Sequence, residues 1–252
     1  MVFDIYNNFI LGNRMLSRQD YENFQIQWII TNTVSCFLAF LIWLIVGLVM
    51  DNIKPDLDYW LKNTIFLISF FSPGVVIGLS QWLLLLKKIP TISWLWILSN
   101  LPGLYLGFIS TAVACGFTLL FIINYLQGTH ELTQGFLIGS IGGAIGGAVG
   151  GIITGIIQHF LIRKNFSVNY LWIITSTVSW SISWSLGWTL VFINSRIFNA
   201  IGSFFGITSS SEASYMFGLP LPFFGIVFGF VNAIITGKVL VRLLRQSKQT
   251  HS

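Results

Sequence analysis

Six side chains that form strong hydrogen bonds interrupt the long apolar runs of this sequence. Three follow a tryptophan by four positions and three follow a Gly-x-x-x-Gly pair by three: Asn32, Asn100 and Ser176, and then Gln81, Gln158 and Asn232. An amide in hydrocarbon is costly unless it is hydrogen-bonded, so these groups should face protein or water. One interpretation is that they bond to one another between helices, at about 0.6–2 kcal/mol per bond. The other is that they form the floor of a vestibule that opens to the cytoplasm and binds a small polar group.

Aromatic and imidazole side chains in the same runs suggest a second kind of binding. Trp180, Trp184 and Trp188 recur every four residues and so share one face of a helix, and His159 directly follows Gln158. Core packing explains this stripe without any ligand. Alternatively, the stripe flanks a flat apolar ligand such as a chlorophyll, a carotenoid or a lipid. His159 is then the one histidine placed to ligate a macrocycle metal within the bilayer.

Catalytic signatures are absent from the sequence. It holds no His-Glu-x-x-His, no Gly-x-Ser-x-Gly, no phosphate loop ending in Gly-Lys-Ser/Thr and no paired carboxylates within an apolar run. Ion-coupled transport usually needs a charged side chain inside the membrane, and every acidic residue lies in a loop, a tail or the edge of a run. We therefore expect neither an enzyme, nor a metal site, nor a proton- or sodium-driven pump. Nucleic acid is not an expected partner, because no large basic cluster is present.

The elements that position these residues are helices in lipid. Only 8% of the 252 residues are charged and 54% are hydrophobic, whereas a soluble domain carries about 25% charged residues. Roughly 20 apolar residues span a bilayer. Six runs are long enough: about Ile26–Met50, Thr64–Leu86, Ser93–Tyr125, Gly135–Ile162, Tyr170–Asn194 and Gly218–Leu240. Pro102 is the expected kink site of the third run.

The basic residues predict the orientation of these spans. With the N-terminus in the cytoplasm, the inside segments hold ten of the 13 basic residues, and only Lys54, Lys62 and Arg196 lie outside. Both termini are then cytoplasmic. Residues 1–23 form a cytoplasmic or interfacial segment, residues 24–245 a single membrane domain, and residues 246–252 a tail. Tryptophans near the cytoplasmic ends, including Trp28, Trp96 and Trp172, are expected in an interfacial belt.

The runs repeat one another in sequence. Trp28–Ser35 and Trp172–Ser179 match at seven of eight positions, and Trp96–Gly103 keeps the tryptophan and the polar pair. These similarities predict an all-α fold of three parallel helix-hairpin repeats, at about 24–90, 91–165 and 166–245. A pseudo-threefold axis along the membrane normal would arrange six helices as a ring, although a linear array is the alternative. The six polar residues would share one depth, thickened by hydroxyl residues such as Ser35, Ser99, Thr175 and Ser179.

Glycines recur on the second helix of each hairpin. The residues expected at helix contacts are Gly74, Gly78, Gly139, Gly143, Gly147, Gly151, Gly155, Gly225 and Gly229. A glycine face lets a neighbouring backbone approach closely. Packing inside the bundle is the first interpretation, and a dimer seam or a pore lined by bare backbone are the alternatives.

One group of proteins shares these motifs. Gly78–Lys88, followed by Trp94, Trp96 and Gly107, resembles uncharacterised multi-pass membrane proteins common in cyanobacteria. Gly155–Lys164 is similar to the same motif, with His159 where the group usually has tryptophan. The resemblance covers roughly two-thirds of the chain. It implies a bacterial inner-membrane or thylakoid location, and it implies no activity.

The sequence therefore favours a membrane subunit that performs no catalysis. Such a subunit or scaffold would pack against partner membrane helices or a second copy of itself, or would bind lipid-like or pigment ligands. The alternative is a channel or facilitator for a small solute, with the polar layer as its filter. Membrane lipid is an expected partner in both cases.

Overall fold

The computed structural model describes residues 18–52, 59–126, 131–163, 166, 170–204 and 220–249. They form α2 (Arg18–Asn52), α3 (Tyr59–Leu86), α4 (Asn100–Tyr125), α5 (Glu131–Ile162), α6 (Leu171–Phe204) and α8 (Pro220–Gln249). A 3₁₀ segment, η1 (Trp94–Leu98), precedes α4. The described chain contains no strand, which confirms the all-α prediction.

Four of these helices are long and apolar enough to cross a membrane. The spans are Gln19–Gly47, Trp94–Tyr125, Thr133–Ile162 and Pro220–Gln246. This confirms the expectation of a helical protein with several apolar, membrane-type segments. Helices α2 and α8 extend past the predicted runs, into the segments assigned to the two tails. Residues 1–17 and 250–252 of those tails lie outside the described chain.

Two prolines lie within the helices, at positions with different consequences for hydrogen bonding. Pro102 lies in the first turn of α4, where a missing backbone N–H breaks no helical bond, so it is not the expected kink. Pro73 lies inside α3 and cannot donate to the Ser69 carbonyl. The hydroxyl of Ser72 donates to that carbonyl oxygen at 2.7 Å, so the apolar helix continues without a bare acceptor.

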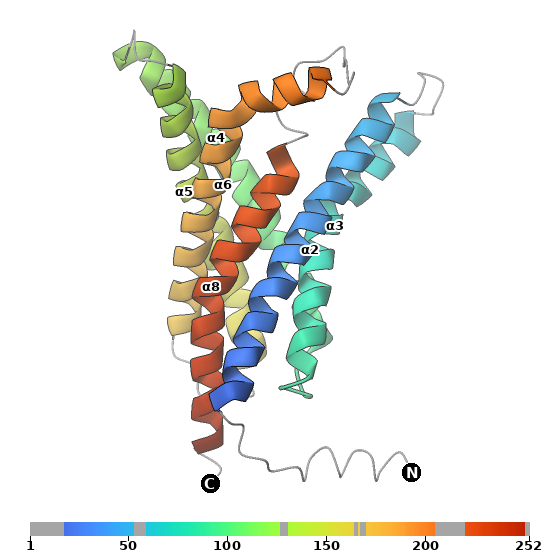
Figure 1. The fold of residues 1–252 in the computed structure, drawn as a ribbon, viewed down its shortest axis with the longest axis vertical. Helices are drawn as coiled ribbons and strands as arrows, with labels where there is room; N and C mark the ends of the chain where they lie inside the picture. Colours follow the sequence, from blue (N-terminus) through green and yellow to red (C-terminus); the bar gives the residue numbers. More distant parts are fainter. Residues whose placement is uncertain are drawn as a thin grey trace.

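The six helices pack as a closed ring. Each contacts the next in chain order, α3 contacts both η1 and α4, and α8 returns to pack against α2. The start of α2 and the end of α8 lie at the same end of the bundle (Figure 1). We call this the terminal end and the opposite one the far end. A closed ring gives every helix two neighbours and one outward face.

Aliphatic side chains cover the outward faces. On α2 and α6 they recur about every four residues: Ile26, Ile30, Val34, Leu38 and Ile42, and Ile174, Val178, Ile182, Leu186 and Leu190. Many polar side chains are buried instead, and none of the described buried side chains is charged. This is the inverse of a soluble bundle, and it suits an apolar solvent.

The interior contains two hydrophobic clusters. The terminal-end cluster holds Trp28, Trp96 and Trp172. The far-end cluster holds Phe40, Phe224 and the three tryptophans of the α6 stripe. The six polar-layer residues lie along the helices between these two clusters.

Candidate functional site

All six predicted polar-layer residues are buried inside the ring. Their exposed fractions are 1% for Asn32, 4% for Gln81, 3% for Asn100, 4% for Gln158, 2% for Ser176 and 6% for Asn232. The six residues come from six different helices. None faces the outer surface, so each must find its hydrogen bonds within the protein or from small molecules inside it.

Gln81 on α3 joins three helical segments. Its Oε1 accepts from Trp96 Nε1 at 3.1 Å and from Asn100 Nδ2 at 3.2 Å. Its Nε2 donates to Asn32 Oδ1 at 2.6 Å. A single amide thus links α2, η1 and α4 through both of its polar atoms.

Gln158 on α5 makes the equivalent contacts in the next hairpin. Its Oε1 accepts from Trp172 Nε1 at 3.2 Å. Its Nε2 donates to Ser99 Oγ at 3.1 Å and to Asn100 Oδ1 at 3.4 Å. In both hairpins the glutamine accepts from the tryptophan of the following hairpin and donates to polar residues of its own.

These contacts form one continuous chain of hydrogen bonds. It runs from Trp172 through Gln158, Asn100 and Gln81 to Asn32, whose Nδ2 donates to the Trp28 carbonyl oxygen at 2.8 Å. Each amide accepts at its oxygen and donates at its nitrogen, so every one of these polar atoms has a partner within the protein. The geometry is that of hydrogen bonds between helices, the first of the two interpretations of the polar layer.

The third hairpin departs from this pattern. Trp28 Nε1 donates to Thr236 Oγ1 at 3.1 Å rather than to Asn232, which lies one turn earlier on α8. Asn232 Oδ1 instead accepts from Ser179 Oγ at 2.7 Å. Thr236 therefore takes the acceptor role that Gln81 and Gln158 have. Alignment of the three hairpins did not identify Thr236, because it lies four residues after the last position of the Gly-x-x-x-Gly-x-x-Gln/Asn motif.

The glycine contacts explain this offset. Gly78 lies against Ile97, and Gly155 lies against Ile173 and Ser176, so both reach the residue that directly follows a repeat tryptophan. Gly229 lies against Asn32 and Thr33, so α8 is displaced along α2 by about one turn. The small residues of α8 continue to Gly237. A side chain at Gly237 would come within 2.9 Å of Trp28 Cδ1, so glycine leaves Trp28 the room it needs.

The repeat tryptophans are not in an interfacial belt, contrary to our expectation. Trp28, Trp96 and Trp172 are at most 2% exposed, whereas Trp60 and Trp94 are 75% and 60% exposed. The physical reason is the indole N–H, which needs an acceptor when buried and finds one on a neighbouring helix. The sequence does contain a signal for this burial. In all three hairpins the tryptophan lies one turn before a polar residue that faces the interior.

The predicted packing glycines lie at contacts between helices of the bundle. On α5, Gly139, Gly143, Gly147 and Gly151 face α6, while Gly142, Gly146 and Gly150 face α4. Gly74 lies against Leu101, and Gly225 lies against Cys36. A Cβ at Gly143 would come within 2.6 Å of the Trp184 carbonyl oxygen, and one at Gly150 within 2.6 Å of the Gly103 carbonyl oxygen. These faces are covered by neighbouring helices, which fits packing inside the bundle.

The tryptophan stripe of α6 points into the ring. Trp180, Trp184 and Trp188 are at most 7% exposed. Trp184 lies 4.9 Å from the Phe108 ring, and Trp180 lies 5.1 Å from the Phe228 ring, centroid to centroid. Protein rings thus occupy the faces proposed for a pigment. Trp184 Nε1 has no hydrogen-bond partner, which makes it an unused donor in this cluster.

His159 lies apart from this stripe. It is three residues from the end of α5, whereas Trp180 is nine residues into α6, a difference in depth of roughly 9 Å. Its ring stacks on Tyr170 at 6.1 Å, and its Nδ1 has no hydrogen-bond partner. The described chain contains no group of three or more His, Cys, Asp or Glu side chains arranged for a metal ion. His159 and the stripe do not form one site.

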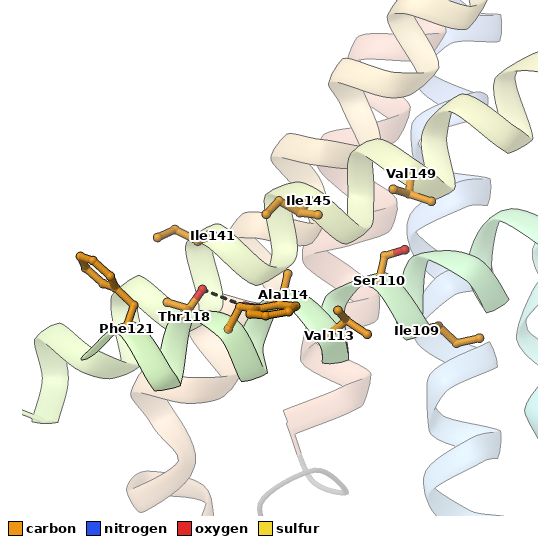
Figure 2. Close-up of a pocket in the computed structure, with 10 residues that line it drawn as sticks. Ile109, Ser110, Val113, Ala114, Thr118, Phe121, Ile141, Ile145 and Val149 are labelled. Carbon is orange, nitrogen blue, oxygen red and sulfur yellow. Dashed lines mark hydrogen bonds between the residues drawn. The ribbon is translucent and has the colours of Figure 1, made fainter. Parts of the chain in front are cut away.

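An apolar groove lies on the outer surface between α4 and α5. It has a volume of about 540 Å³, within the range of about 300–1,000 Å³ typical of small-molecule sites. Ser110, Ala114 and Thr118 follow one line of α4, and Ile141, Ile145 and Val149 face them from α5 (Figure 2). Thr118 donates its hydroxyl to the Ala114 carbonyl oxygen at 2.8 Å, so that hydroxyl is already used. The groove opens on the face that carries the aliphatic side chains.

The described basic side chains gather at the terminal end. They are Lys87, Lys88, Arg163, Lys238, Arg242 and Arg245. Arg163 lies over the Phe160 ring at 4.7 Å, and Arg245 lies over the Tyr21 ring at 5.0 Å. These cation–π contacts hold charged groups against aromatic surface at the end of the bundle.

Comparison with known proteins gives no relative. No protein family, no curated protein and no solved structure matches this chain. The resemblance to cyanobacterial membrane proteins therefore stays a prediction. What the protein does has to be inferred from its own residues.

Proposed function

We propose that the protein is a non-enzymatic integral membrane subunit with six spans and both termini in the cytoplasm. Helices α3 and α6 would be the two spans beyond the four apolar ones. Each lies between two apolar helices in the ring and has its own outward aliphatic stripe. Serines and tryptophans lower the mean hydropathy of α6, and those of its described side chains that are buried, such as Ser179, Ser183 and Trp184, face other helices. The basic side chains at the terminal end support a cytoplasmic position for that end.

The same proposal includes three hairpin repeats around a pseudo-threefold axis. Its support is the seam where the second helix of one hairpin meets the first of the next. At two seams a tryptophan donates to a glutamine, and at the third Trp28 donates to Thr236. Glycines lie beside each of the three contacts. Each of the three seams thus combines a repeat tryptophan, a polar acceptor on the neighbouring helix and packing glycines.

The function of this subunit is to present its outer surface to lipid-like molecules, pigments or partner helices. The observation that carries this proposal is the α4–α5 groove, an apolar recess open to the surrounding membrane. Phe117, which lines it, is 70% exposed, and Val113 is 53% exposed. A long apolar molecule or a neighbouring helix would cover these side chains. The setting would be a bacterial inner membrane or a thylakoid.

Purification from native membranes in a mild detergent tests this proposal. Lipids, pigments and proteins that co-purify with the full chain would be identified by mass spectrometry and absorption. Ala114→Phe fills the groove and is expected to remove the bound component. Val34→Phe adds the same ring to the exposed face of α2 and should leave it in place. A chain that migrates alone, with bulk lipid only, would contradict the proposal.

The facilitator hypothesis has less support. A filter needs polar groups that are free to replace the hydration shell of a solute. The amides of Gln81, Asn100 and Gln158 are instead bonded to one another and to tryptophans. Apolar clusters lie on both sides of them along the bundle.

A further inference from the structure

The last turns of α8 carry three cations on one face. Lys238, Arg242 and Arg245 follow one another at intervals of four and three residues, so they are neighbours on the helix surface, and all three are exposed. The exposed side chains of Ile226 and Phe230 precede them at the same spacing. The outward face of α8 therefore changes from apolar to cationic along one line. We call the three cations the cation row.

No carboxylate of the protein neutralises the middle of this row. Helix α8 contains no acidic residue, and neither does α6, its neighbour on one side. The neighbour on the other side, α2, has Asp20 and Glu22 near its start. Within the described residues, neither Lys238 nor Arg242 forms an ion pair with a carboxylate. Their positive charges are thus available to an anion from outside the protein.

The position of the row along α8 matches the headgroup layer of a bilayer. Lys238, Arg242 and Arg245 lie 18, 22 and 25 residues after Pro220, or about 27, 33 and 38 Å along the helix axis. The hydrocarbon core is about 30 Å thick, and each headgroup layer adds about 5–7 Å. A helix that enters the hydrocarbon at Pro220 therefore carries the row from the opposite hydrocarbon edge through the headgroups. The last turns of α8 also extend past the neighbouring helices at the terminal end (Figure 1).

The two flanking helices do not share this charge. Between Gln19 and Gly47, α2 has no basic residue, although Arg18 lies at its first position. The single basic residue of α6, Arg196, lies toward the far end. The positive-inside bias counts basic residues near the ends of spans, whichever way they face. It does not require three of them on the outward face of one helix, so the row needs an explanation of its own.

We propose that the cation row of α8 is a binding site for the headgroup of an anionic phospholipid. The ammonium group of Lys238 and the guanidinium group of Arg242 donate charge-assisted hydrogen bonds to its phosphate oxygens. One acyl chain lies along α8 toward Phe230, which is about 12 Å from Lys238 and so within the same leaflet. A zwitterionic lipid brings no net charge and would leave the row uncompensated. The inference rests on the proposed membrane position of α8, but not on the α4–α5 groove.

Native mass spectrometry of the purified full chain tests this site. The chain is titrated with phosphatidylglycerol and with phosphatidylcholine of the same acyl chains, and the ratio of the two binding constants is measured. The wild-type chain should prefer phosphatidylglycerol. Each cation near an anionic surface is worth about a fivefold gain in affinity, so a triple variant with Lys238→Gln, Arg242→Gln and Arg245→Gln should lose at least about tenfold of the preference.

A second triple variant controls for net charge. Lys87→Gln, Lys88→Gln and Arg163→Gln remove the same three positive charges from other helix ends and should leave most of the preference in place. Equal losses in both triple variants would overturn the proposal, because they would show a general attraction to the terminal end. An unchanged preference in the α8 variant would overturn it as well.

A double variant covers the case in which the α8 triple variant does not fold. Lys238→Gln with Arg242→Gln keeps the contact of Arg245 with the Tyr21 ring at 5.0 Å, and it should still lose most of the preference. A double variant that retains the full preference would overturn the proposal. Equal binding of both lipids by the wild-type chain would overturn this inference alone. The proposed function fails separately, if the chain leaves native membranes with bulk lipid only.

Discussion

The indole nitrogen of Trp28 on α2 donates to the hydroxyl of Thr236 on α8 at 3.1 Å, across 208 positions of the sequence. This bond joins the first and last described helices and so closes the ring. The other two repeat tryptophans donate to Gln81 and Gln158, which lie close to them in sequence. The acceptor for Trp28 is therefore a threonine that is distant in sequence and becomes its neighbour only when α8 packs against α2.

Thr236→Val should weaken this closing contact. The change keeps the shape of the side chain and removes the acceptor, which leaves the Trp28 indole without its partner. We expect a loss of about 0.6–2 kcal/mol, as for other hydrogen bonds between membrane helices. Thermal unfolding in detergent measures it. Thr133→Val, at an exposed position of α5, is the control, and an equal loss in both variants would contradict the assigned role.

Gln81 and Asn100 should be energetically coupled. The amide of Asn100 donates to Gln81 Oε1 at 3.2 Å, so removal of either residue takes away one hydrogen-bond partner of the other. A double-mutant cycle with Gln81→Leu and Asn100→Leu is expected to give an interaction energy of about 0.5–3 kcal/mol. The pair Gln81→Leu and Thr236→Val shares no bond and should be additive. Additivity in both cycles would mean that the chain of amides does not act as a unit.

Gly143→Ala should destabilise the α5–α6 contact. The new Cβ would come within 2.6 Å of the Trp184 carbonyl oxygen, and backbone cannot move aside cheaply. A cost of about 1–3 kcal/mol is expected from overpacking. Gly116→Ala is the matched control, since nothing lies within 4 Å of its Cβ position. There alanine should be neutral or stabilising by up to about 1 kcal/mol, because it restricts the unfolded chain. Equal effects at the two glycines would refute close packing at Gly143.

Liposome flux separates the membrane-subunit proposal from the facilitator hypothesis. The wild-type chain, reconstituted in liposomes, should pass small polar solutes no faster than protein-free liposomes do. The Gln81→Leu, Gln158→Leu, Asn232→Leu triple variant should behave in the same way. Wild-type flux that the triple variant abolishes would instead favour a filter built from these amides.

The helices can be predicted well from the sequence, because the features that indicate them lie within single segments. Apolar runs of about 20 residues, and residue pairs such as Gly143 and Gly147 four positions apart, can be recognised without tertiary contacts. The polar residues were likewise recognisable, since an amide such as Gln81 is unusual within an apolar run. For the repeat tryptophans, the predicted interfacial environment is wrong, because they are buried between helices. Trp28 resembles an interfacial residue in sequence, and only a buried acceptor on another helix makes its burial favourable.

An all-helical chain suited to an apolar solvent follows from the amino-acid sequence alone, because helix period and hydropathy are properties of each segment. Tertiary structure decided which hydrogen bonds form. Asn232 and Gln158 hold equivalent places in the sequence, yet α8 lies about one turn further along its neighbour than α5 does. That displacement follows from small residues reaching Gly237, and it gives the bond of Trp28 to Thr236. Registers between helices are set by side chains on both partners, and no single segment contains that information.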